Sequence, residues 1–165
     1  MRSFALVGLL LAHSSQSDVG LCEDFSFADA REAAPRFEQY VSNPERLKAA
    51  EPRITAHYRA FRSAIRLGAA SGPNFAGHYT FAQWAAGAGG ICWAIVDAKN
   101  GFIGDGGCVE TFGVAGQEPQ FRLDSRLLIL TSPRGIGYYE WTGAALRELR
   151  FIERKELCDR SASKR

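Results

Sequence analysis

Residues 72–101 constrain the fold of this chain more than any other stretch. An aromatic and β-branched run at residues 77–85 is followed by a glycine-rich corner at residues 86–90 and an apolar run at residues 92–98. An Asn-Gly dipeptide at residues 100–101 ends the stretch. Aromatic and β-branched residues favour strands, glycine permits positive φ, and Asn-Gly suits a tight hairpin. The stretch therefore predicts two antiparallel strands and a turn into a third.

Side chains in the first of these strands alternate between two faces, because successive residues of a strand point to opposite sides. One face carries His78, Thr80, Ala82 and Trp84, and the other carries Tyr79, Phe81 and Gln83. The even spacing predicts that His78 and Trp84 lie on the same side of the sheet, where we expect both to be structural.

Upstream of the strands, residues 44–68 have a helical apolar period. The apolar positions are Ile54, Tyr58, Phe61, Ile65 and Leu67. On another face, Arg59, Arg62 and Arg66 follow each other at i, i+3 and i+7, so they form a basic row. The row is either a solvated helix face or a docking surface for an acidic protein or an anionic envelope polymer.

The rest of the chain continues as strands and turns. We expect a glycine-rich surface loop at residues 104–119, a strand with a polar corner at 121–131, a hairpin of residues 136–141 and 145–151, and a charged tail at 153–165. The predicted fold class is α+β: a single domain in which an N-terminal amphipathic helix packs on one antiparallel meander sheet of five or six strands.

The N-terminus has the layout of a secretory signal peptide. Met1 and Arg2 supply a positive charge, residues 4–12 are apolar, and residues 13–17 are small or polar. Nine apolar residues are too few for a membrane span, which needs roughly 20. We expect residues 1–17 to be removed and residues 18–165 to form one domain without a membrane span, in the periplasm or secreted.

Four cysteines follow this segment, and an even number in an exported chain points to two disulfides with three possible connectivities. Cys22 and Cys158 lie near the two ends, whereas Cys92 and Cys108 flank the Asn-Gly hairpin. We therefore predict the nested pairing Cys22–Cys158 and Cys92–Cys108. A zinc site is the competing interpretation, but the chain has no C-x-x-C motif, so neither a metal nor a cofactor is expected.

Several short motifs resemble a family of small exported bacterial proteins. The family pattern runs FAGHY, WGCGxxC, an aliphatic-Asp hairpin, a D-S-R-L strand and a terminal Tyr-Trp hairpin. The matching residues lie at 74–79, at Trp84, at 94–97 with Gly101, and at 124–127. The likeness covers about residues 59–149 and implies a fold pattern without an activity. The chain departs from the pattern in the glycine corner, where Ala86 and Gly90 stand at the family's paired cysteines.

His78 is the candidate for catalysis. Its functional interpretation is a general base oriented by Asp97 or Glu110, and its structural interpretation is a half-buried histidine bonded to a carbonyl. No G-x-S-x-G motif and no P-loop occur in the sequence. We favour the structural interpretation, because no possible catalytic partner of His78 lies at a spacing along the sequence that is typical of a catalytic site.

The charge balance narrows the possible functions. The chain has 20 Lys and Arg residues and 18 Asp and Glu residues, so it lacks the basic excess expected of a nucleic-acid binder. The aromatic residues Trp84, Trp93, Trp141, Tyr138 and Tyr139 form either a core or a ligand groove. We expect a non-enzymatic binding module of inhibitor or immunity type. The alternative is a cell-envelope hydrolase or transferase that uses His78 with an acidic partner.

Overall fold

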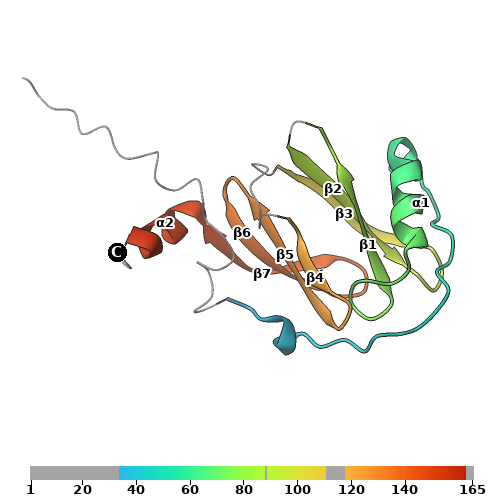
Figure 1. The fold of residues 1–165 in the computed structure, drawn as a ribbon, viewed down its shortest axis with the longest axis horizontal. Coiled ribbons are helices and arrows are strands. Elements are labelled where there is room, and N and C mark those ends of the chain that lie inside the picture. Colours follow the sequence, from blue (N-terminus) through green and yellow to red (C-terminus); the bar gives the residue numbers. More distant parts are fainter. Residues whose placement is uncertain (1–33, 88, 111–117, 163–165) are drawn as a thin grey trace, which may run out of the picture.

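The computed structural model describes residues 34–87, 89–110 and 118–162. Two antiparallel sheets pack face to face, and a helix lies against the outer side of each (Figure 1). The three-stranded sheet has the order β1 (Tyr79–Ala85), β2 (Gly90–Asp97), β3 (Ile103–Glu110). The four-stranded sheet has the order β4 (Gln120–Arg122), β5 (Ser125–Ser132), β6 (Gly135–Trp141), β7 (Leu146–Glu153).

The predicted fold class was wrong. The strands do form consecutive antiparallel pairs, but they divide into two sheets between β3 and β4, so the chain is a mostly β sandwich. The predicted N-terminal helix at residues 44–68 is also wrong, because the α-helix α1 is only Arg62–Ala70, preceded by the 3-10 turn η2 (Arg59–Phe61). Residues 43–54 are without helix or strand.

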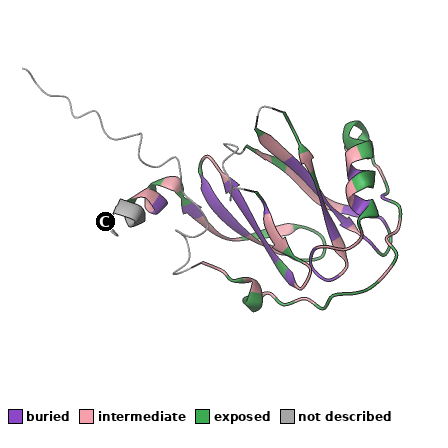
Figure 2. Ribbon diagram, in the orientation of Figure 1, coloured by how far each residue is buried: buried purple, intermediate pink, exposed green. Residues whose placement is uncertain are grey.

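Three apolar clusters hold these layers together (Figure 2). The central cluster joins the two sheets and includes Phe81, Trp93, Leu128 and Trp141. A second cluster packs α1 on the outer face of β1–β3, and a third packs the helix α2 (Arg154–Ala162) and the 3-10 turn η1 (Phe37–Gln39) on the outer face of β4–β7. Burial of apolar surface between layers is the main stabilising contribution.

The two sets of side chains predicted to lie on opposite faces of the first strand do lie on opposite sides of β1. Thr80 and Ala82 are buried on the α1 side, whereas Phe81 is buried between the sheets and stacks on Trp93 at 5.4 Å. Trp84 belongs to the α1 side, where its ring lies 5.3 Å from that of Phe61. A central strand covered on both faces needs a continuous apolar run, which β2 has at residues 91–96.

Two further segments differ from the prediction. The expected loop at residues 104–119 begins with strand β3, since Gly106 and Gly107 pair with Ala94 and Trp93 across the sheet. Side chains at these positions would be 2.8 Å from Trp93 O and 3.2 Å from its ring, so glycine serves close packing here rather than a turn. The expected charged tail begins with helix α2, whose Leu157 is buried against the four-stranded sheet.

The chain before α1 crosses the end of both sheets. Ser42 donates its backbone N–H to Asp124 O at 2.8 Å, Glu45 to Gly77 O at 2.9 Å, and Arg53 to Gly101 O at 2.7 Å. These bonds tie residues 42–53 first to the β4–β5 turn and then to the start of β1 and the β2–β3 turn. This segment supplies the acidic partner of His78 described below.

Replacing Gly101 with alanine should lower stability more than replacing Gly72. Both glycines have positive φ (+76° and +82°), which costs alanine about 1–2 kcal/mol. A Cβ at Gly101 would also lie 2.0 Å from Glu51 O, whereas at Gly72 it would meet nothing within 4 Å. We expect Gly101→Ala to cost about 1–3 kcal/mol more than Gly72→Ala. Chemical denaturation of both variants measures the difference, and equal losses would mean that residues 51–53 do not pack on the turn.

Candidate functional site

His78 lies between two carboxylates at the end of the three-stranded sheet. Its Nδ1 is 3.1 Å from Glu45 Oε1, and its Nε2 is 3.8 Å from Asp97 Oδ1. The first distance is a hydrogen bond and the second is too long for one. The side chain is 20% exposed, and its ring stacks on Tyr79 at 4.3 Å.

Turn chemistry fixes the two carboxylates. Asp97 accepts hydrogen bonds from the backbone N–H of Lys99 and from the Asn100 side chain, both at 2.8 Å. Lys99 Nζ in turn contacts Glu45 Oε1 at 2.8 Å. The Asp-x-Lys-Asn turn that the sequence shows therefore positions Asp97 beside His78, whereas Glu45 comes from the segment that crosses the sheet ends. No sequence pattern pointed to Glu45, because its contact with His78 depends on tertiary structure.

The other predicted partner of His78 is far along the sheet. Asp97 pairs with Tyr79 at one end of β2, whereas Glu110 pairs with Gly90 at the other end. In the described part of the chain, no serine, threonine or cysteine side chain is hydrogen bonded to His78. His78 therefore lies close to two carboxylates, but the described residues place no hydrogen-bonded nucleophile beside it.

Glu45 makes this cluster sensitive to acid. The hydrogen bond from Lys99 holds the pKa of the Glu45 carboxyl below its usual value, and the charges of Lys99 and His78 act in the same direction. A carboxyl whose pKa is lowered by folding stabilises the fold above its unfolded pKa, and this contribution is lost as pH falls through the folded pKa.

Glu45→Gln should therefore lower the melting temperature near pH 6, and the difference from the wild-type protein should disappear as the pH falls through the lowered pKa of Glu45. Melting curves of both proteins across this range measure the effect. Glu51→Gln is the matched control on the same segment. A difference that persists unchanged at about pH 3 would contradict the ionic role of Glu45.

The predicted arginine row lies on the solvent side of α1 and η2. Arg59, Arg62 and Arg66 are all exposed. Arg66 Nε is 3.1 Å from Glu51 Oε1, whereas Arg59 and Arg62 have no carboxylate partner among the described residues. Leu67 follows the last of these arginines and is 77% exposed.

The apolar stripe opposite this row is buried only in part. Ile65 is fully buried, but Phe61 is 41% exposed and Leu67 lies on the solvent side. The prediction that Phe61 is buried was therefore wrong. Leu67 is exposed because it lies two residues after the buried Ile65, on another side of α1. We call Arg59, Arg62, Arg66 and Leu67 the basic face.

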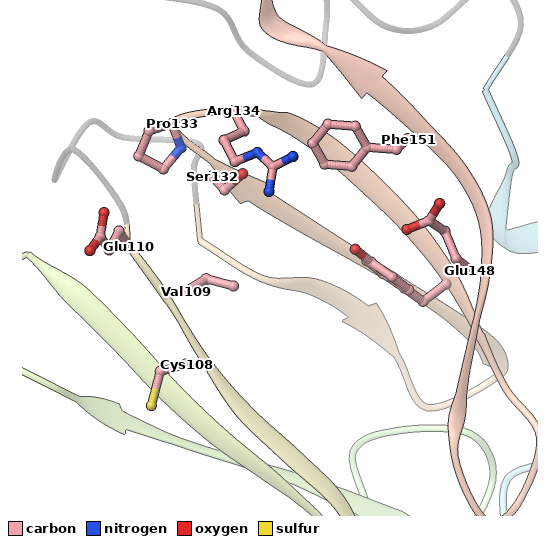
Figure 3. Close-up of a pocket in the computed structure, with 9 residues that line it drawn as sticks. Cys108, Val109, Glu110, Ser132, Pro133, Arg134, Glu148 and Phe151 are labelled. Atoms are coloured by element: carbon pink, nitrogen blue, oxygen red, sulfur yellow. The ribbon is translucent and has the colours of Figure 1, made fainter.

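Of the two interpretations of the aromatic residues, a core or a groove, the structure shows a core for three of them. Trp93, Tyr138 and Trp141 are each at most 6% exposed and belong to the core clusters. Tyr139, however, lines a hollow of about 560 Å³ between β3 and the β5–β7 strands (Figure 3). Arg134, Glu148 and Phe151 also line this hollow, and none of these three was singled out from the sequence.

The predicted Cys92–Cys108 disulfide is confirmed, and it joins directly paired positions of β2 and β3. No free cysteine occurs among the described residues. Cys22 and the predicted signal peptide at residues 1–17 lie outside the described ranges, so the Cys22–Cys158 pairing stays a prediction. In those ranges no helix has the length and apolar character to cross a bilayer, and no cluster of metal-binding side chains is found.

Comparison of the chain with protein-family models, curated proteins and solved structures finds no match. The resemblance to a family of exported proteins therefore stays a prediction from the sequence. Function has to be inferred from the geometry of the chain itself.

Proposed function

We propose that this protein is an exported, non-enzymatic binding module that docks on an acidic protein through the basic face. The observation that supports this most is the exposure of Leu67, at 77%, directly beside arginines on a fixed helix. An exposed apolar side chain with neighbouring arginines has the composition of a protein-binding surface, in which an apolar centre is surrounded by charged residues.

Charge is distributed unevenly along the chain in a way that suits an acidic partner. Residues 45–70 contain six Lys and Arg residues and two Glu residues, a net charge of +4. The whole chain has a net charge of +2, so all other residues together carry −2. A local positive field of this kind attracts a negatively charged surface and speeds association.

Close packing holds the basic face in a fixed position. Ile65 and Ala69 of α1 are at most 2% exposed. A Cβ added at Gly68 would lie 2.6 Å from Ala82 Cβ, so the helix sits directly on β1. A fixed row of guanidinium groups loses little entropy on binding and can form paired contacts with carboxylates.

Leu67 distinguishes a protein from a polymer as the partner. An anionic polymer would need only the arginines, whereas burial of a leucine requires an apolar counterpart. Burying an exposed leucine contributes about 1.5–3 kcal/mol. Export is supported by the signal-like segment at residues 1–17 and by the Cys92–Cys108 disulfide, which is typical of oxidising compartments.

The proposal is tested by capture from an envelope extract with immobilised mature protein. Arg62→Glu and Leu67→Ser should each abolish capture of one acidic protein, which added salt should also weaken. Arg36→Glu and Val41→Ser are the matched controls, since Arg36 and Val41 are exposed near η1 at the four-stranded sheet and should leave capture unchanged. Capture that is lost only with Arg62→Glu would indicate an anionic polymer and contradict the proposal.

The alternative function is an envelope hydrolase or transferase with His78 as general base. The contact of His78 with Glu45 and its approach to Asp97 favour it, because a carboxylate can orient a catalytic imidazole. The hollow shown in Figure 3 is lined by other residues than His78. A hydrolytic activity abolished by His78→Gln but retained in Glu110→Gln would favour this alternative.

A further inference from the structure

The hollow in Figure 3 forms because two edge strands diverge. β3 and β7 are each the last strand of their sheet. They are joined near one end, where Leu146 donates its backbone N–H to Asp105 Oδ2 at 3.0 Å. Toward Glu110 and Phe151 they separate, since the three-stranded sheet does not cover all of the four-stranded one, and a space of about 560 Å³ opens between them (Figure 3).

In the described part of the chain, two hydrogen-bond donors that line this hollow have no acceptor. The Arg134 side chain extends into the hollow, and it forms no ion pair within the described ranges (Figure 3). The Tyr139 hydroxyl likewise has no hydrogen-bond partner among the residues that the structure describes. Burial raises the pKa of Tyr139, and the charge of Glu148 adds to this, so the hydroxyl stays protonated and able to donate.

A glycine holds the Tyr139 ring in place. A Cβ added at Gly137 would lie 2.5 Å from both the Oη and Cε2 atoms of Tyr139, so the ring rests across the bare backbone of residue 137. The Arg134 backbone is fixed as well, because Arg154 donates its N–H to Arg134 O at 2.8 Å. Both donors are therefore anchored on short, hydrogen-bonded turns or strands.

The walls of the hollow are apolar and its rim is acidic. Val109 and Pro133 face Phe151 across the space, and Glu110 and Glu148 lie at the edge (Figure 3). Arg134 and the Tyr139 hydroxyl line the same hollow and can each donate a hydrogen bond to a carboxylate there, and an apolar body suits the walls. The acidic residues at the rim favour a ligand that carries a neutral or basic group next to its apolar part.

We propose that this hollow binds the C-terminal end of an extended peptide. Arg134 and Tyr139 bind the terminal carboxylate, and the last side chain lies between Val109 and Phe151. A peptide fits better than a small acid, because the space is open between two edge strands whose outer backbone groups can pair with an extended chain. This site is separate from the basic face and does not depend on the function proposed above.

Binding of short peptides to the mature protein tests the assignment. The probes are acetyl-Lys-Ala-Xaa peptides with Xaa as Ala, Leu or Phe, each with a free carboxylate or an amide at its C-terminus, in calorimetric titrations. Amidation should weaken the best peptide at least about tenfold, as expected for loss of a charge-assisted hydrogen bond. Arg134→Gln should weaken the free acid by a similar factor and leave the amide unchanged.

Arg36→Gln is the matched control, because Arg36 is also exposed but lies beside a different hollow. Its affinity for every probe should equal that of the wild-type protein. Equal affinity for acid and amide, or no binding at about 1 mM of any peptide, would overturn the assignment. Binding of 3-phenylpropionate as tight as that of the best peptide would overturn the choice of a peptide as the ligand.

Discussion

Trp141→Ala should lower the free energy of unfolding by about 3–5 kcal/mol, the range for large aromatic truncations in a core. Trp141 is 1% exposed and lies in the cluster that joins the two sheets. Its ring is 5.2 Å from that of Tyr79, and its Cη2 atom lies where a side chain on Gly104 would be, 2.6 Å from that Cβ position. Urea denaturation followed by circular dichroism measures the loss.

Trp84→Ala is the matched comparison for this prediction. Trp84 is partly exposed and packs between α1 and the three-stranded sheet rather than between the sheets. We expect its loss to be roughly half that of Trp141, because less apolar surface returns to water. A larger loss for Trp84 than for Trp141 would mean that the contact between the two sheets is not the main core.

Replacing both Cys92 and Cys108 with alanine should cost about 3 kcal/mol, the value expected for a closed loop of roughly this length. The two positions are 16 residues apart and pair directly across β2 and β3. Thermal unfolding of the double variant, compared with the wild-type protein with and without reductant, measures the effect. A double variant as stable as the oxidised wild-type protein would show that the β2–β3 pairing alone fixes this hairpin.

Local patterns predicted the strands well where a turn signal and an alternating pattern coincide. The Asn100–Gly101 turn has glycine at φ +76°, and Thr142–Gly143 has glycine at φ +95°, each between paired strands. At these two turns the backbone conformation is decided within a few residues, so the sequence carries the information. The single strand predicted at residues 121–131 was wrong, because residues 123–124 separate β4 from β5.

The division into two sheets could not be predicted in the same way. Consecutive antiparallel strands can continue one sheet or start a second, and only the packing of both faces decides. Leu127 and Ile129 face outward to α2 and η1, whereas Leu128 and Leu130 face the other sheet, so β5 is apolar on both sides. This continuous apolar run fits a strand between two layers, yet it also fits a central strand of a single covered sheet.

In the candidate sites, too, contacts set by nearby residues were predicted and contacts between distant segments were not. Asp97 was predicted as a partner of His78, and the pairing of Tyr79 with Asp97 brings the two residues together. Glu45 and the donors of the hollow were missed, because their positions depend on contacts between segments far apart in the chain. Tyr139 was noted only as one of several aromatic residues, and the glycine two positions before it is the local signal that its ring lies across the strand.

Photo-crosslinking from the basic face shows whether this face contacts an acidic protein. A photoreactive amino acid at position 67 is compared with one at position 41, since Leu67 and Val41 are both exposed apolar residues, 77% and 61%. We expect position 67 to crosslink to a protein segment rich in Asp and Glu, Arg62→Glu to abolish the product, and position 41 to give none. Crosslinks from position 41 alone, or a product at position 67 that survives Arg62→Glu, would contradict the proposed contact.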